Sequence, residues 1–65
     1  MNKLHEYMQR HHLSQREFAE RIGTTQPVIN RFARGKVIPG RRLALAIERE
    51  TGGAVTVASW DQQGE

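Results

Sequence analysis

The sequence predicts an all-α domain of four or five short helices, with a short C-terminal strand as the alternative to a fifth helix. Three observations indicate this fold class. Apolar side chains recur at the three- and four-residue spacing of helices through most of the 65 residues. Ser, Thr or Asn precedes several of these segments, as helix N-caps do. Glycines stand where three of the segments would end, at Gly23, Gly35 and Gly52.

Length and composition limit the function classes. A chain of 65 residues predicts one domain, which we expect to span 1–61, followed by a flexible tail at 62–65. Hydrophobic residues are 37% and charged residues 26%, a balance typical of globular proteins. There is no cysteine, which excludes disulfides and thiolate-bound zinc. No apolar run approaches the roughly 20 residues of a membrane helix. We therefore expect a cytoplasmic protein without membrane contact, cofactor, metal or small-molecule ligand.

The first two helices have clear start signals. Asn2 can cap a helix over about 3–11. Ser14 and Glu17 form a capping box, in which each side chain bonds a backbone N–H at the start of a helix over about 15–22. Gly23 ends this second helix. The inward faces are expected to carry Leu4, Tyr7, Met8 and His11 in the first helix, and Phe18, Ala19 and Ile22 in the second.

The third helix follows almost at once, over about 26–34. Thr25 is a suitable N-cap, and Pro27 in the first turn loses no intrahelical hydrogen bond. Val28, Ile29 and Phe32 form its apolar stripe. In the loop 35–40 that follows, we expect Val37 and Ile38 to pack back onto the core.

A fourth helix is predicted over about 40–51, with Leu43, Ala46 and Ile47 inward and two glycines after it. The segment 54–60 is ambiguous. Val55 and Val57 alternate with smaller residues as in a strand. Alternatively, Thr56 caps a short helix that carries Trp60 inward, and we favour this helix.

The formal net charge of +3 is unevenly distributed. No acidic residue lies between Glu20 and Glu48. A continuous positive segment in a short domain is the electrostatic footprint of nucleic-acid binding, although a solvated face without a partner has the same composition. The cations of this segment are Arg21, Arg31, Arg34, Lys36, Arg41 and Arg42.

Two short helices joined by a tight glycine turn form the helix-turn-helix pattern. Ala19 stands where only a small side chain fits between the crossing helices, and Ile29 stands where the second helix packs on the first. With these features, the segment from Leu13 to Phe32 resembles the helix-turn-helix of the lambda-type repressor and Cro family. The similarity covers roughly 3–51, and the closing segment resembles small Cro-like prophage regulators. It implies a lambda-repressor-like fold and a sequence-specific DNA-binding regulator, most readily a repressor.

The resemblance implies that the helix from Gln26 lies in the major groove of double-stranded DNA. Gln26 and Asn30 are the best base readers, since Gln and Asn amides bridge adenine N6 and N7. Pro27 contacts a thymine methyl or only shapes the helix start. Arg31 and Arg34 read guanine or bind a phosphate. Gln15 is implied to brace Gln26 and to donate to a phosphate, and the other expected phosphate contacts are Arg16, Thr25, Lys36, Arg41 and Arg42.

The family resemblance also implies a homodimer on a pseudo-palindromic operator, and we place the dimer contact at Val55, Val57 and Trp60. Trp60 is alternatively a core residue. The rival function is an antitoxin-type protein–protein module that neutralises a toxin and regulates its own operon. An enzyme is not expected, because no paired carboxylates and no nucleophile–base set are visible. Ser14 is explained as a cap, and His5, His11 and His12 lack the spacing of a metal site.

Overall fold

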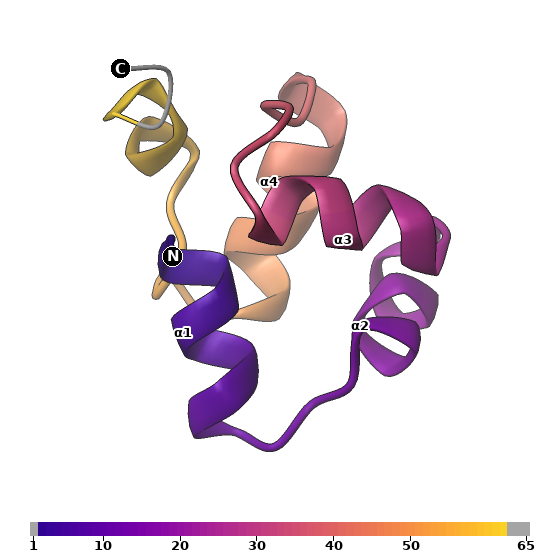
Figure 1. Cartoon of the computed structure of the whole chain (residues 1–65). Coiled ribbons are helices and arrows are strands. Elements are labelled where there is room, and N and C mark those ends of the chain that lie inside the picture. The colour runs from indigo at the N-terminus through magenta and orange to yellow at the C-terminus, as the bar shows by residue number, and fades with distance from the viewer. Residues whose placement is uncertain (1, 63–65) are drawn as a thin grey trace.

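The fold was examined in a computed structural model, which describes residues 2–62. In this range the chain forms five helices and no strand (Figure 1). The all-α prediction is confirmed, and the alternative of a C-terminal strand is wrong. The helices are α1 (Lys3–Arg10), α2 (Gln15–Ile22), α3 (Gln26–Ala33), α4 (Arg41–Glu50) and the 3-10 helix η1 (Val57–Gln62).

The ends of α2 form as the sequence predicts. The Ser14 hydroxyl accepts the N–H of Glu17 at 3.0 Å, and the Glu17 carboxylate accepts the N–H of Ser14 at 3.3 Å. Gly23 takes a left-handed conformation with φ 78° and ends the helix. Because both ends are determined locally, α2 begins and ends at fixed residues before any packing is considered.

The end of α1 lacks a glycine and still turns in the left-handed conformation. His12 has φ 56°, the one positive φ among the non-glycine residues that the structure describes. Its N–H donates to the Gln9 carbonyl at 3.2 Å, and the N–H of Leu13 donates to the Met8 carbonyl at 2.9 Å. These two bonds form a Schellman motif, which places His12 where glycine is usually found.

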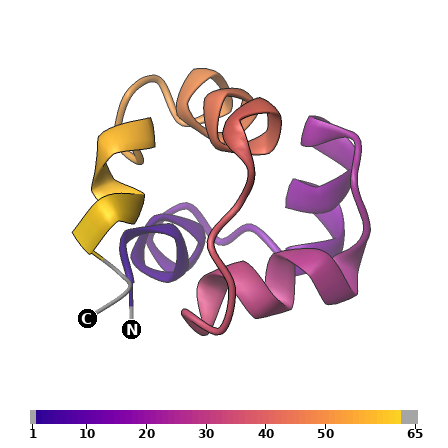
Figure 2. The same cartoon turned by 90° about the horizontal axis from the view of Figure 1, so that it is seen from above.

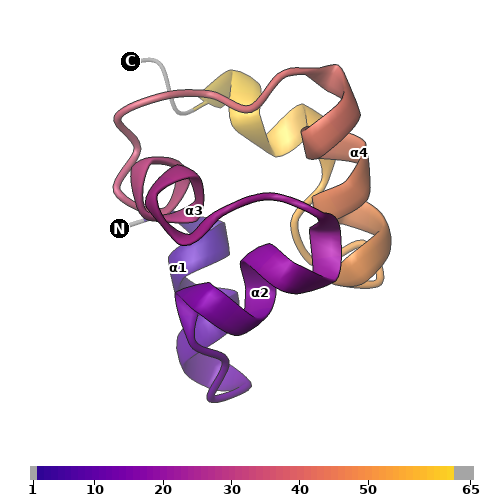
Figure 3. The same ribbon diagram turned by 90° about the vertical axis from the view of Figure 1, so that its right-hand side faces the viewer.

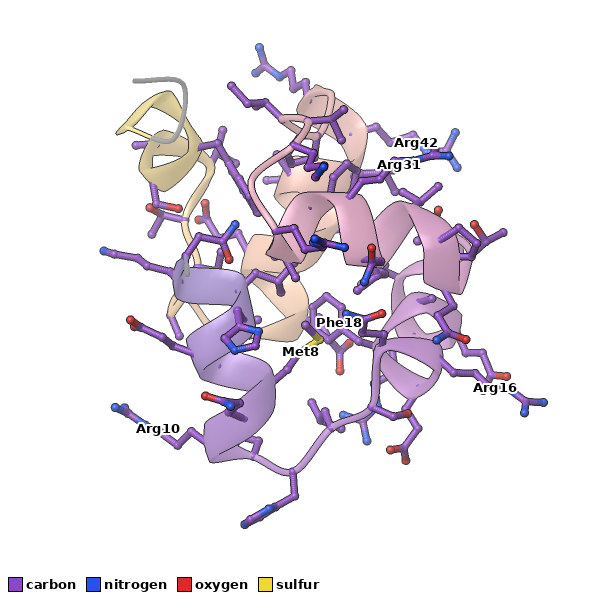
Figure 4. All side chains as sticks on the ribbon, in the orientation of Figure 1. Met8, Arg10, Arg16, Phe18, Arg31 and Arg42 are labelled. Atoms are coloured by element: carbon purple, nitrogen blue, oxygen red, sulfur yellow. The ribbon has the colours of Figure 1, made fainter. Side chains whose placement is uncertain are left out.

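The core is apolar and collects side chains from every helix. Leu4, Phe18, Ile29 and Ile47 are fully buried. Phe18 of α2 and Met8 of α1 extend into the space between the helices (Figure 4). Contacts join α2 to α3 and α4, α1 to α3, and α4 to η1. The other buried apolar residues are Met8, Ala19, Phe32, Ala33, Ala44, Val55 and Trp60.

The C-terminal segment completes this core. The Thr51 hydroxyl donates to the Ile47 carbonyl at 2.8 Å and accepts the N–H of Val55 at 3.1 Å, which turns the chain back. Thr56 then caps η1 by accepting the N–H of Ser59 at 3.1 Å, as predicted for the helical alternative. Trp60 packs edge-on against Phe32, with ring centroids 6.1 Å apart. Trp60 is therefore a core residue.

One expectation about the chain's connections needs correction. Val37 and Ile38 do not pack onto the core, since they are 43% and 51% exposed. Pro39 is the buried residue of this loop, while Val55 and Trp60 of the C-terminal segment are buried in the core. At the end of the chain, η1 runs to Gln62, the first residue of the expected tail. The rest of the expected tail, 63–65, lies outside the described residues.

The helix-turn-helix lies at one side of the molecule. Viewed from above, α2 and the start of α3 lie opposite η1 and the two chain ends (Figure 2). Seen from the side, α3 crosses over α2 after the tight turn, and the loop after α3 runs across the top to α4 (Figure 3). The outer side of α3 is thus presented away from the C-terminal segment.

Candidate nucleic-acid interface

The turn between α2 and α3 sets the orientation of α3. Gly23 reverses the chain, and the N–H of Thr24 donates to the Ala19 carbonyl at 2.9 Å. Ala19 is 2% exposed and Ile29 is 0% exposed, so the two helices approach closely through these side chains. With this side buried, the polar residues of α3 lie outward. Gln26, Pro27, Arg31 and Arg34 are exposed, and Asn30 is half-buried.

A shallow hollow marks the surface where α2 and α3 begin. It is lined by Gln15, Gln26, Pro27, Asn30 and Arg31. Four of these five side chains carry hydrogen-bond donors, and three are carboxamides that both donate and accept. Side chains of these types form the hydrogen bonds by which proteins read base edges in a major groove. The structure therefore brings together the residues that the sequence selects for base contacts, except Arg34 at the far end of α3.

One hydrogen bond links the two helices inside this hollow. The Asn30 side-chain nitrogen donates to the Gln15 side-chain oxygen at 3.3 Å. The family resemblance implies a bond between Gln15 and Gln26, and the structure pairs Gln15 with Asn30 instead. No side-chain hydrogen bond of Gln26 is present within residues 2–62. The sequence did not predict the pair of Gln15 and Asn30, because the family pattern places the partner of Gln15 at the start of α3. The crossing of the helices instead places Gln15 beside the second turn of α3.

Thr25 occupies the predicted N-cap position of α3, but its side chain accepts no backbone hydrogen bond. Pro27 lies in the first turn, where its missing N–H costs nothing. The exposed hydroxyl of Thr25 and the uncapped N–H groups of this turn are thus donors that the described part of the chain leaves without partners.

The cations divide into paired and unpaired sets. Arg21 forms an ion pair with Glu50 at 3.3 Å, which links α2 to α4. Arg16 pairs with Glu20 at 3.7 Å, but both side chains are well exposed, so this pair contributes little. The cations that pair with no carboxylate whose side chain the structure describes are Arg31, Arg34, Lys36, Arg41 and Arg42.

Three arginine side chains, one from each of α2, α3 and α4, point the same way. Arg16, Arg31 and Arg42 extend toward the side where α2 and α3 meet, and Arg10 extends away from it (Figure 4). The side chains come from three different helices. The fold therefore directs positive charge from three helices to the side where α2 and α3 meet, where it suits phosphate binding.

The start of α4 is a second place suited to an anion. Its N-cap is Gly40, which offers no side-chain acceptor, and its first turn holds no acidic residue. Arg41 and Arg42 follow directly, although cations oppose the helix dipole at this end. A bound phosphate would accept from the uncapped N–H groups and would reverse that unfavourable arrangement.

The residues selected for the dimer contact lie mostly inside the molecule. Val55 is 1% exposed and Trp60 is 3% exposed, so their side chains are packed within one copy of the chain. Val57 is half-buried, and its N–H donates to the Glu48 carboxylate at 2.8 Å. Of the three, Val57 is the one with appreciable exposed surface.

Residues 2–62 contain no group of three or more His, Cys, Asp and Glu side chains placed to hold a metal ion. His11, expected on the inner face of its helix, is exposed and stacks on Tyr7, with ring centroids 4.3 Å apart. None of the helices seen in residues 2–62 has the length and hydropathy needed to span a bilayer.

The chain was compared with known proteins. Residues 4–56 match the model of a protein family described as helix-turn-helix. Comparisons with curated proteins and with solved structures found no match. The matched range covers most of the chain and includes α2 to α4 and all of α1 except Lys3, so the geometry of the α2–α3 unit and the family match agree. The chain belongs to the helix-turn-helix family of the lambda repressor and Cro type, and it is a DNA-binding transcriptional regulator.

Proposed function

We propose that this regulator is a Cro-like repressor that binds a pseudo-palindromic operator as a homodimer. The observation that carries the proposal is the outer side of α3. There, carboxamides from α2 and α3 line one hollow together with Arg31, which pairs with no carboxylate whose side chain the structure describes. A repressor of this kind acts by occupying a promoter and blocking polymerase, which requires no chemistry beyond binding.

Base readout is assigned to the side of α3 that faces away from the core. Gln26 and Asn30 bridge adenine N6 and N7, and Pro27 contacts a thymine methyl. Arg31 lies in the same hollow and reads guanine or binds the adjacent phosphate. Arg34, at the C-cap of α3, is further from the hollow and is better placed for the backbone.

Phosphate contacts are assigned to the rim of the hollow and to the next loop and helix. Thr25 and Gln15 supply neutral donors at the starts of α3 and α2, while Lys36, Arg41 and Arg42 supply positive charge. Arg16 joins this set by exchanging its weak pair with Glu20 for a phosphate. These contacts fix the position of α3 in the groove without reading sequence.

The dimensions of the molecule favour two copies. Its longest extent is 27 Å. Two half-sites on one face of DNA lie about 34 Å apart. One copy therefore reads one half-site, and a second copy is needed for the other.

The dimer contact is proposed at the end of the molecule that carries η1 and the loop after α3. Both segments lie at the top in Figures 1 and 3. Val37 and Ile38 expose apolar side chains in that loop, and Val57 begins η1. Val55 and Trp60 support this surface from inside rather than contact the second copy.

Selection of bound sequences from a random duplex pool tests the proposal. We expect an inverted repeat whose half-sites are centred about 10 base pairs apart. A single unrepeated site would contradict the homodimer, and no enrichment would contradict sequence-specific binding. Transcription in vitro from a promoter that carries the selected site should fall when the protein is added, and a rise would contradict repression.

A further inference from the structure

We propose that Gln15 is a positioning residue that holds the Asn30 amide in the one orientation that reads adenine. This inference rests on the proposed function and deepens it. It names the residue that sets base preference at one operator position, although that residue lies on α2 rather than on the groove-facing helix.

The hydrogen bonds that Asn30 can form limit how its amide meets a base. An Asn amide has two N–H donors and one carbonyl acceptor. One donor is used by the Gln15 oxygen at 3.3 Å, which leaves Oδ1 and one N–H. An acceptor beside a donor is the pair that accepts from adenine N6 and donates to N7. If the Asn30 amide rotated by half a turn, its oxygen would face the Gln15 oxygen, so that orientation is excluded as long as the Gln15 oxygen is the acceptor.

The local structure keeps both partners in place. Gln15 is the first residue of α2, whose start is fixed by the capping box of Ser14 and Glu17. Asn30 follows Ile29, which is 0% exposed and anchors α3 in the core. Both side chains are half-buried, which restricts their rotamers. The bond therefore joins two rigid backbones.

The remaining group of Gln15 gives the pair a second role. Because its oxygen accepts from Asn30, its two N–H donors are left for another acceptor. At the edge of the hollow, that acceptor is a DNA phosphate. One side chain thus links a backbone contact to a base contact, and correct placement on the phosphate also places Asn30.

Gln26 differs from Asn30 in that no hydrogen bond from the described part of the chain holds its amide. It lines the same hollow and is exposed, but no hydrogen bond within residues 2–62 fixes its amide. A Gln amide that can rotate presents its donor and its acceptor in either order. We therefore expect Asn30 to discriminate among bases more strictly than Gln26 does.

The experiment begins with selection from a random duplex pool by the wild-type protein and by Asn30→Ala. The base pair whose preference is lost in Asn30→Ala is the one that Asn30 reads. Affinities for duplexes carrying each of the four base pairs at that position are then measured for Gln15→Met and Gln15→Glu. Met has similar length and helix propensity but cannot accept the bond, while Glu accepts it and cannot donate to a phosphate. Thermal melts check that both variants are folded.

The two variants have opposite expected results. Gln15→Met should reduce the preference for adenine at that position by about threefold to tenfold, as expected for the loss of one intramolecular hydrogen bond. Gln15→Glu should weaken binding to all four duplexes and keep the preference. An unchanged preference in Gln15→Met, or a lost one in Gln15→Glu, would overturn the inference.

A matched double-mutant cycle separates the two candidate partners of Gln15. Combining Gln15→Met with Asn30→Ala should be strongly non-additive, and combining it with Gln26→Ala should be additive. The reverse pattern would show that Gln15 acts on Gln26, and would overturn the inference while leaving the proposed operator binding intact. If the wild-type selection yields no preferred sequence at all, it is the proposed function that fails.

Discussion

At the scale of single residues, the polar side chains divide into those proposed to read bases and those proposed to bind phosphates. Gln26 and Asn30 lie on the outward side of α3, in the hollow that also contains Gln15. Arg42 lies on α4 and extends toward the same side from outside that hollow (Figure 4). Base readers affect preference among sequences, whereas phosphate contacts affect all sequences alike. Loss of a base reader is therefore expected to lower the preference for one sequence, and loss of a phosphate contact to lower the affinity for every sequence.

Replacing Gln26 by Ala should weaken binding to the selected site by about 1–3 kcal/mol and should change binding to unrelated duplexes little. The reason is that its amide is proposed to contact a base edge and no phosphate. Equilibrium titration of both duplexes measures the effect. Equal losses on the two duplexes would show that Gln26 does not read a base.

Replacing Arg42 by Ala should weaken binding to every duplex by a similar factor. It should also make the slope of log affinity against log salt shallower by about one unit, since one fewer counterion is released. Arg10→Ala is the matched control, because Arg10 extends away from the hollow and should leave the slope unchanged (Figure 4). A loss confined to the selected site would assign Arg42 to base readout.

The site could be predicted from sequence only in part. The outward side of α3 follows from periodicity, because Ile29 and Phe32 had to face inward. The acid-free segment shows from the sequence where the cations gather along the chain. It does not show that Arg21 forms an ion pair with Glu50. That pair joins residues 29 positions apart, and the Gln15–Asn30 pair joins residues 15 apart. Both depend on how helices cross, which local patterns do not determine.

At the scale of the elements, the helix-turn-helix relies on the left-handed turn at Gly23. The φ of 78° is unfavourable for residues with a side chain. A Cβ placed there would meet no atom within 4 Å, so the requirement for glycine comes from the backbone and not from crowding. The end of α2 is predicted from the sequence because Gly23 marks it. The turn after α1 has no such marker, since its left-handed residue is His12 and not a glycine.

Gly23→Ala should lower the free energy of unfolding by about 1 kcal/mol because of the strained left-handed residue. DNA affinity should fall little once the protein is folded, since the turn has room for a methyl group. Chemical denaturation measures the first effect and duplex titration the second. An unchanged stability would show that the turn tolerates a side chain.

At the scale of the whole molecule, the C-terminal segment closes the core and so determines which surfaces stay exposed. Val55 and Trp60 are packed inside, while Val37 and Ile38 remain outside. The sequence predicts Val37 and Ile38 on the core and Val55 at a dimer contact, and it leaves Trp60 open between that contact and the core. The reason is that apolar residues in loops and near chain ends have no periodicity that tells core from surface.

Replacing Val37 and Ile38 together by Ser should weaken dimerisation by at least about tenfold, as expected when apolar side chains at the centre of an interface are truncated. Leu45→Ser is the matched control, since Leu45 is 37% exposed but lies on α4. Sedimentation equilibrium measures both. If the double variant dimerises as the wild type does, the two copies meet through another surface.

In the proposed complex, this molecule reads a particular DNA sequence through α3 while its cations hold the DNA backbone. The affinity for the selected duplex and for a scrambled duplex, each measured over a range of salt concentrations, tests this most directly. We expect the selected duplex to bind more tightly at every concentration, and both affinities to fall steeply with salt, by about 0.9 log units per tenfold change for each phosphate contacted. Equal affinities that do not change with salt would contradict the claim and would favour a protein partner, as in an antitoxin-type module.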